Sequence, residues 1–86
     1  MELNEWEVYM IQASDGKLYT GMTNNLDKRF KDHLHSKRGA KFFRFSSPVK
    51  VVFRESHPNR SEAQKREINI KRMDRSQKLT LIQENL

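Results

Sequence analysis

The chain is organised around residues 8–33, which read VYMIQASDGKLYTGMTNNLDKRFKDH. Two runs of strand-forming residues flank Asp15-Gly16, and an Asp-Gly pair between such runs is a strong β-hairpin signal. Either Asn24 or Asn25 can then cap a helix, because an asparagine side-chain oxygen accepts a backbone N–H of the first helical turn. The stretch therefore predicts a hairpin that leads directly into a helix.

Polar and aromatic side chains converge from these expected elements. Tyr9 and Tyr19 stand one on each arm of the hairpin. Arg29 and His33 are four residues apart, so they share one face of the helix. This set is polar where a core would be apolar, which indicates a candidate site. The structural alternative is two tyrosines with buried rings and wet hydroxyls, a surface arginine and a hydrogen-bonded histidine.

Loop length decides whether the two tyrosines share a face of the sheet. A two-residue Asp-Gly loop places Tyr19 opposite Gln12, on the face away from Tyr9. A three-residue loop centred on Gly16 places Tyr19 opposite Ala13, on the same face as Tyr9. A one-residue slip turns every side chain to the other face, so the candidate site favours the second arrangement, or a bulge with the same effect.

The remaining segments predict one further strand and two further helices. Residues 6–13 form a first strand that is apolar on both faces, which is typical of a central strand. The β-β-α-β-α-α order predicts an α+β fold, with a three-stranded, largely antiparallel sheet and helices packed on it. We expect residues 1–86 to form a single domain. The other expected elements are a first helix over residues 25–37 with an apolar stripe of Leu26, Phe30 and Leu34, a strand over residues 49–54, a helix from a Ser61 cap to about Met73, and a last helix with a Ser76 cap and a stripe of Leu79, Ile82 and Leu86.

Composition narrows the setting of the protein. The 86 residues include no cysteine, and no apolar run is long enough for a membrane span. We therefore expect a cytoplasmic protein with no membrane association and no obligate protein partner. The net charge is +6, and residues 37–86 hold thirteen Lys and Arg against five Asp and Glu. This basic half favours a polyanionic partner, although a solvated surface explains it equally well.

The segment KRGAKFFRF at residues 37–45 interleaves four cations with three phenylalanines. The cations are candidate contacts to nucleic-acid phosphates, with a ring available for base stacking. Alternatively, the rings dock into the core while the cations stay in water. We expect both to hold, with most rings in the core and the cations facing the ligand. The four cations are Lys37, Arg38, Lys41 and Arg44.

Glu67 is a carboxylate on the expected apolar stripe of the later helix, between Ala63 and Ile70. An unpaired buried charge is costly, so Glu67 needs a partner. One interpretation is an ion pair with Arg29 or with a cation of its own helix. The other is a ligand for one divalent cation, and Mg²⁺ suits a lone carboxylate because it keeps several waters and takes oxygens from a phosphate. The other acidic residues are scattered, which favours a one-metal over a two-metal centre.

These motifs resemble those of the GIY-YIG nuclease superfamily. The likeness covers nearly the whole chain, and it is closest to the small stand-alone GIY-YIG proteins of bacteria. The chain departs from the family triplets at Glu7, which replaces a glycine, and at Thr20, which replaces an isoleucine. The matching residues are Glu7-Val8-Tyr9, Tyr19-Thr20-Gly21, Leu26-x-x-Arg29-x-x-x-His33 and Ala63-x-x-x-Glu67.

The resemblance implies metal-assisted hydrolysis of a nucleic-acid phosphodiester, with DNA favoured over RNA. Glu67 would hold one Mg²⁺ or Mn²⁺ ion, and Arg29 would stabilise the charge that develops on the phosphate. His33 together with Tyr9 or Tyr19 would activate the attacking water. The rival interpretation is a non-catalytic module that binds DNA or RNA on the same scaffold. A third is a protein-interaction domain with an acidic partner.

Overall fold

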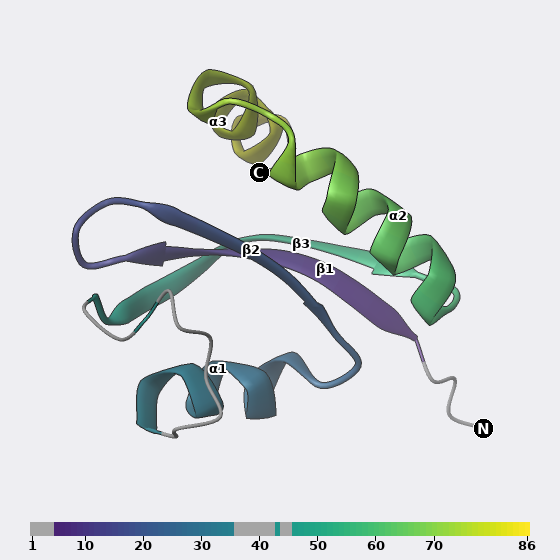
Figure 1. The fold of residues 1–86 in the computed structure, drawn as a ribbon, viewed down its shortest axis with the longest axis horizontal. Helices are drawn as coiled ribbons and strands as arrows, with labels where there is room; N and C mark the ends of the chain where they lie inside the picture. Colours follow the sequence, from purple (N-terminus) through teal and green to yellow (C-terminus); the bar gives the residue numbers. More distant parts are fainter. Residues whose placement is uncertain (1–4, 36–42, 44–45) are drawn as a thin grey trace.

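The structure, a computed structural model, describes residues 5–35, 43 and 46–86. The predicted β-β-α-β-α-α order and the α+β class are confirmed (Figure 1). The third strand is longer at both ends than expected. The elements are β1 (Trp6–Ala13), β2 (Leu18–Thr23), α1 (Leu26–His35), β3 (Pro48–His57), α2 (Arg60–Lys71) and α3 (Arg75–Glu84).

The three strands form one antiparallel sheet in the order β2-β1-β3, so β1 is central as predicted. Helix α1 covers one face of this sheet, whereas α2 and α3 lie on the other (Figure 1). Alternate residues of β1 serve the two faces. Val8 and Met10 belong to the core beneath α2, and Tyr9 and Ile11 pack with Leu26 of α1. The apolar character of β1 on both faces therefore reflects two separate cores.

A three-residue loop, Ser14–Gly16, joins β1 to β2. The Ala13 N–H donates a hydrogen bond of 2.9 Å to the Lys17 carbonyl and closes the loop. Gly16 ends the loop with a φ of 87°, a left-handed conformation that glycine adopts without steric cost. The predicted loop length is correct, but the loop is centred on Asp15 instead of Gly16, because the left-handed position is the last of the three.

This loop sets the register of the hairpin. Tyr19 pairs with Ile11, so it lies on the same face as Tyr9, as the candidate site required. Thr20 pairs with Met10 and faces the other side, toward α2. Thr20 is 3% exposed, and within the described residues its hydroxyl is buried without a hydrogen-bond partner.

The outer strand β3 is irregular. Its register against β1 shifts at two places between residues 10 and 13. Such shifts are β-bulges, in which one strand carries an extra residue and bends. Just after α3, the Asn85 side chain donates a hydrogen bond of 3.2 Å to the Arg54 carbonyl of this strand.

Helix α1 packs on a different stripe from the predicted one. Its cap is Asn25, whose side chain accepts the Lys28 N–H at 3.1 Å, in line with one of the two expected caps. Leu26 is buried, but Leu34 is 42% exposed, and His33 takes the inward position at 5% exposure. The predicted stripe is therefore wrong at its end, because the helix is turned to place a polar ring against the sheet.

The caps of the two later helices differ from prediction. Asn59, not Ser61, caps α2, and its side chain accepts a first-turn N–H at 2.9 Å. Asp74, not Ser76, caps α3 and forms a capping box with Gln77. Asparagine and aspartate cap helices as well as serine does, and both helices begin slightly earlier than expected.

Helix α3 also packs on the core through other residues than predicted. Leu81 and Ile82 pack against the core beneath α2, whereas Leu79 is 45% exposed and Leu86 is 90% exposed. The expected stripe is thus correct only at Ile82. Across the described part of the chain, no helix combines the length and apolar character needed to cross a membrane.

Candidate active site

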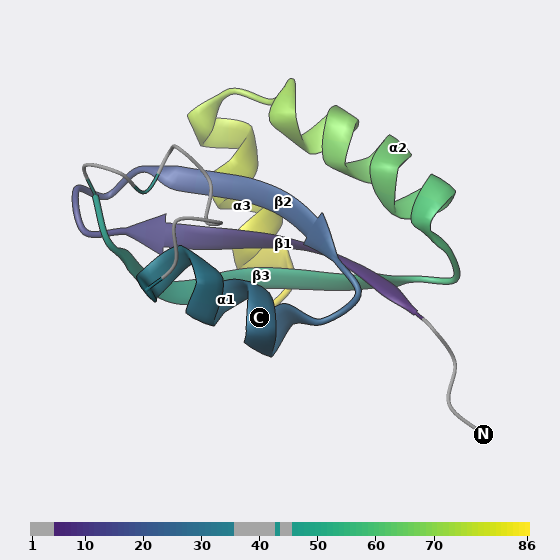
Figure 2. The same cartoon turned by 60° about the horizontal axis from the view of Figure 1, so that its bottom comes forward.

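Four of the predicted site residues meet on the face of the sheet that α1 covers. Tyr9 comes from β1, Tyr19 from β2, and Arg29 and His33 from successive turns of α1. Figure 2 shows α1 in front of the sheet, where its inward face meets β1. The Tyr9 hydroxyl lies 3.1 Å from the His33 Nε2, which joins strand to helix by a buried hydrogen bond.

Gly21 makes room for this arrangement. It pairs with Tyr9 across the hairpin. A Cβ atom at Gly21 would lie 2.6 Å from the Tyr9 hydroxyl oxygen and 3.1 Å from a ring carbon of Tyr19. The Tyr9 ring therefore extends over β2, toward the outer side of the sheet, only because residue 21 has no side chain.

Phe43 completes an aromatic cluster around the hydrogen bond. Its ring centroid lies 4.7 Å from that of His33 and 5.1 Å from that of Tyr19. Tyr19 and His33 meet edge to face, with centroids 5.2 Å apart. Sequence reasoning missed Phe43, because three phenylalanines within four residues gave no signal of which one would contact the site.

The Tyr9 hydroxyl is held in its neutral form. Burial raises the pKa of Tyr9 strongly, and the nearby Tyr19 and Glu67 raise it further. Arg29 acts in the opposite direction, because its hydrogen bond and positive charge lower the pKa of Tyr9. A further cation beside the hydroxyl would lower the pKa of Tyr9.

His33 is also neutral near pH 7. Burial and, to a smaller extent, the Arg29 charge lower its pKa to about 4, and Asp32 only partly compensates. Arg29 itself is oriented by Asp32, whose carboxylate lies 4.0 Å from the guanidinium. The cluster is thus a neutral Tyr–His pair beside a fixed cation.

Glu67 approaches the cluster from the other side of the sheet. It lies on α2, which packs against β1 and β2, and its side chain is 18% exposed. Its charge is close enough to the Tyr9 hydroxyl to raise the pKa of that group. The ion-pair partner of Glu67 is Lys71 of its own helix, at 3.3 Å, which is one of the two partners that the sequence left open.

The available ligands fit a single hard cation better than a multinuclear site. Within the described residues no three His, Cys, Asp or Glu side chains come together as a metal-binding group. Glu67 is a half-buried carboxylate at the margin of the cluster, and one carboxylate with waters and phosphate oxygens is a common Mg²⁺ environment. The predicted contacts Lys37, Arg38, Lys41 and Arg44 lie outside the described residues.

Comparison with known proteins identifies a matching family. A family model described as the GIY-YIG catalytic domain matches residues 5–80. The UPF0213 protein of Clostridium perfringens is 51% identical over 75 residues, which cover 87% of this chain and 80% of that protein. The UPF0213 protein of Desulfotalea psychrophila is 46% identical over 77 residues, which cover 90% of this chain and 70% of that protein.

A solved structure is similar as well. The solution NMR structure of the UPF0213 protein from Bacillus halodurans superposes with a TM-score of 0.59 at 34% identity, and covers 92% of this chain and 83% of that one. The fold is that of a small α+β domain, an antiparallel three-stranded sheet with Tyr9, His33 and Arg29 gathered beneath and on its first helix. The chain belongs to the GIY-YIG family, as the match over residues 5–80 shows, and its relatives carry the name UPF0213.

Proposed function

We propose that this protein is a nuclease that hydrolyses phosphodiester bonds of nucleic acid, preferably DNA, with the help of one divalent cation. Family membership supports nuclease-type chemistry. The observation that carries the proposal is the buried 3.1 Å contact between the Tyr9 hydroxyl and the His33 Nε2, beside the Arg29 cation. A purely structural tyrosine needs neither a neutral histidine nor an adjacent arginine.

Glu67 would hold the cation, either Mg²⁺ or Mn²⁺. When bound, the ion would supply charge neutralisation for the substrate phosphate. The Glu67 carboxylate already has an ammonium partner, Lys71, at 3.3 Å, and a bound metal ion would take the place of this partner.

Tyr9 and His33 would move the proton of the attacking water. Water gives its proton to the Tyr9 oxygen, while the Tyr9 hydroxyl proton passes to the His33 Nε2. The water oxygen is then a hydroxide that attacks the phosphate, and the positive charge ends on the His33 ring. His33 is neutral in the resting protein because its pKa is about 4, so its Nε2 can face the Tyr9 hydroxyl as an acceptor, and the imidazolium needs the negative charge that develops on the phosphate to stabilise it. Tyr9 is assigned this role because its hydroxyl is the one that contacts His33, and Tyr19 is assigned to position water or phosphate.

Arg29 would stabilise the phosphate as negative charge develops on it. A guanidinium keeps its charge and offers a planar pair of N–H donors to phosphate oxygens. Its place beside the Tyr9 hydroxyl puts this charge next to the attacking group. Loss of a preorganised donor of this kind lowers rates by roughly 10² to 10³.

The test compares matched substitutions with labelled DNA, in Mg²⁺ and in Mn²⁺. Glu67→Gln and Arg29→Ala should each lower cleavage by at least roughly 10²-fold while circular dichroism and the melting temperature stay close to wild type. Glu62→Gln on the same helix and Arg72→Ala are the controls and should cut normally. Full cleavage by either site variant would overturn the proposed mechanism.

A non-catalytic nucleic-acid module is the second candidate. The observation in its favour is that Glu67 already has an ion-pair partner in Lys71. In that case the wild-type protein would bind DNA or RNA, with an affinity that falls steeply as salt rises, but would not cut in either ion. Cleavage by the wild type that depends on Glu67 would exclude this function.

A further inference from the structure

A basic hollow lies on the far side of β2 from the candidate active site. Its volume is about 230 Å³, and its described lining consists of Lys17, Leu18, Arg75 and Lys78. The hairpin supplies two of these residues and the first turn of α3 supplies the other two. Segments far apart in the sequence thus bring three cations to one depression.

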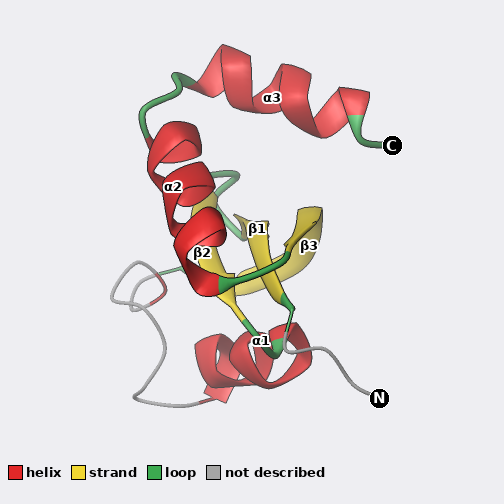
Figure 3. Cartoon of the chain, turned by 90° about the vertical axis from the view of Figure 1, so that its right-hand side faces the viewer, coloured by secondary structure: helices red, strands yellow, loops and turns green. Residues whose placement is uncertain are grey.

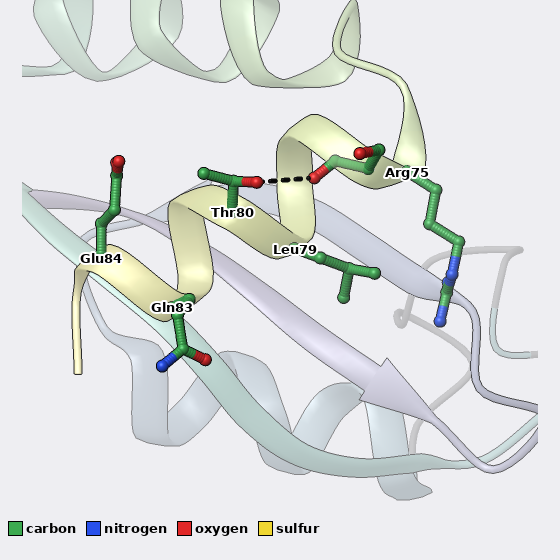
Figure 4. A pocket seen from close by; sticks show the side chains of 6 residues that line it. Arg75, Leu79, Thr80, Gln83 and Glu84 are labelled. Atoms are coloured by element: carbon green, nitrogen blue, oxygen red, sulfur yellow. Dashed lines mark hydrogen bonds between the residues drawn. The ribbon is translucent and has the colours of Figure 1, made fainter.

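The arrangement of these cations is fixed by the fold. The Arg75 guanidinium donates a hydrogen bond of 3.1 Å to the Gly16 carbonyl, and Figure 4 shows the Arg75 side chain reaching from α3 toward the hairpin turn. The Asp74 capping box sets where α3 begins, and so where Arg75 and Lys78 stand. The Arg75 hydrogen bond therefore fixes α3 against the hairpin, and the capping box fixes the start of α3.

Within the described residues none of the three cations of the hollow forms an ion pair. The acids adjacent in sequence are engaged by backbone N–H groups: the Asp15 carboxylate accepts the Lys17 N–H at 3.1 Å, and the Asp74 carboxylate accepts the Gln77 N–H at 2.8 Å. The Asp15 charge also attracts Lys17, so it offsets part, but not all, of the positive charge of the hollow. Like charges that are held together repel one another, and an anion relieves that repulsion. The hollow is accordingly complementary to a phosphate.

The hollow and the candidate active site share one strand. Leu18 lines the hollow and Tyr19 belongs to the aromatic cluster, and consecutive strand residues point to opposite faces. β2 is an outer strand of the sheet, which Figure 3 shows at its margin beneath α2. A polymer that lies along this margin can therefore reach both places.

We propose that Lys17, Arg75 and Lys78 form a subsite for a backbone phosphate of the nucleic acid, flanking the scissile bond across the outer side of β2. The subsite rests on the proposed function, because its ligand is another phosphate of the same strand. The subsite strengthens binding and fixes the position of the protein along the nucleic acid. It does not recognise bases, since phosphate contacts carry no direct sequence information.

The test measures DNA binding in the presence of a chelator, so that binding is read without cleavage. Anisotropy of a short labelled duplex is followed over a salt series for the Lys17→Gln/Lys78→Gln protein. A control, Lys31→Gln/Lys65→Gln, removes the same charge from α1 and α2. The hollow variant should bind more weakly and lower the slope of log Kd against log salt by roughly 1.8, and the control should keep the wild-type slope.

The outcomes separate the two proposals. If both double variants lose equal affinity, or if the hollow variant binds like wild type, the subsite is overturned while DNA cleavage by the wild-type protein still supports the nuclease. If the wild-type protein neither binds nor cuts DNA or RNA at low salt, the proposed function fails and the subsite fails with it.

Discussion

His33 occupies a position on α1 where an apolar side chain would ordinarily face the sheet. Leu26 precedes it by two turns on the same side of the helix, and both are buried, at 4% and 5% exposure. The helix therefore gives up the burial of Leu34, which is 42% exposed, to place an imidazole against Tyr9. The imidazole makes a buried hydrogen bond to the Tyr9 hydroxyl that a leucine at this position could not make.

Burial of His33 predicts loss of stability in mild acid. Its pKa is about 4 in the folded protein and about 6.5 in an unfolded chain, so between these values only the unfolded state takes up the proton. The contribution of His33 to the free energy of unfolding is fully present above pH 6.5 and is lost as the pH falls to 4, by roughly 3 kcal/mol. Urea unfolding of wild type and His33→Gln at pH 7, 5.5 and 4 measures it.

The direct check is an NMR titration of the His33 ring. A midpoint near 4 is expected, and Phe43→Ala should move it upward, because Phe43 packs on the ring at 4.7 Å and keeps water from it. A midpoint near 6.5 in the wild-type protein would contradict the neutral Tyr–His pair.

Thr20 predicts a stabilising substitution. Its hydroxyl is buried without a partner within the described residues, and a buried unpaired polar group costs about 1–3 kcal/mol. Thr20→Val keeps the shape and removes the hydroxyl, so the free energy of unfolding should rise by about 1 kcal/mol, measured by chemical denaturation. Thr23→Val is the matched control and should destabilise, because the Thr23 hydroxyl accepts the Asn25 N–H at 3.1 Å.

At the start of α2, the residue that caps the helix is Asn59, and the nearby Ser61 does not cap it. Asn59→Ala should lower the free energy of unfolding by about 1 kcal/mol, because its side chain accepts a first-turn N–H of α2. Ser61→Ala, inside the first turn, should change stability by less than about 0.5 kcal/mol. If Ser61→Ala lowered the free energy of unfolding more than Asn59→Ala in thermal or urea unfolding, Ser61 would be the cap instead.

The hairpin shows what the sequence could and could not predict. The Asp-Gly pair correctly predicted the hairpin. The sequence left the loop length open, and only the site hypothesis favoured the arrangement found, in which Tyr9 and Tyr19 share a face. The loop centre was wrong by one position, because only the backbone conformation of Gly16 decides which residue ends the turn. Helix orientation was also beyond reach, since Leu34 and His33 are adjacent and either side of α1 could have faced the sheet.

For the whole molecule, the candidate site depends on elements from both faces of one sheet. Tyr9 lies beneath α1 and contacts His33 of that helix, whereas Glu67 comes from α2 on the opposite face. Glu67 could be singled out from the sequence as a carboxylate on an apolar stripe, but its approach to Tyr9 could not. That approach depends on the extension of the Tyr9 ring over Gly21, which is a tertiary contact without a local pattern.

The uneven burial of β1 and α3 predicts that the two elements differ in local stability. β1 contributes Val8 and Met10, both 0% exposed, whereas α3 contains no buried residue and packs only through partly buried Leu81 and Ile82. Amide hydrogen exchange should therefore be slowest in β1 and clearly faster in α3, because α3 can open locally while the sheet persists. Helix α2, with Ala63 and Ile70 buried, is the internal reference. Equal protection of α3 and β1 would show that the helix opens only with global unfolding.

The bulges of β3 bear on how the protein behaves at high concentration. Strand addition by a second chain requires a continuous, evenly spaced row of backbone donors and acceptors, and edge strands that offer one are sites of aggregation. The two register shifts interrupt that row, and the Asn85 amide already occupies the Arg54 carbonyl. The β3 edge of the sheet is thereby a poor template for amyloid-like stacking.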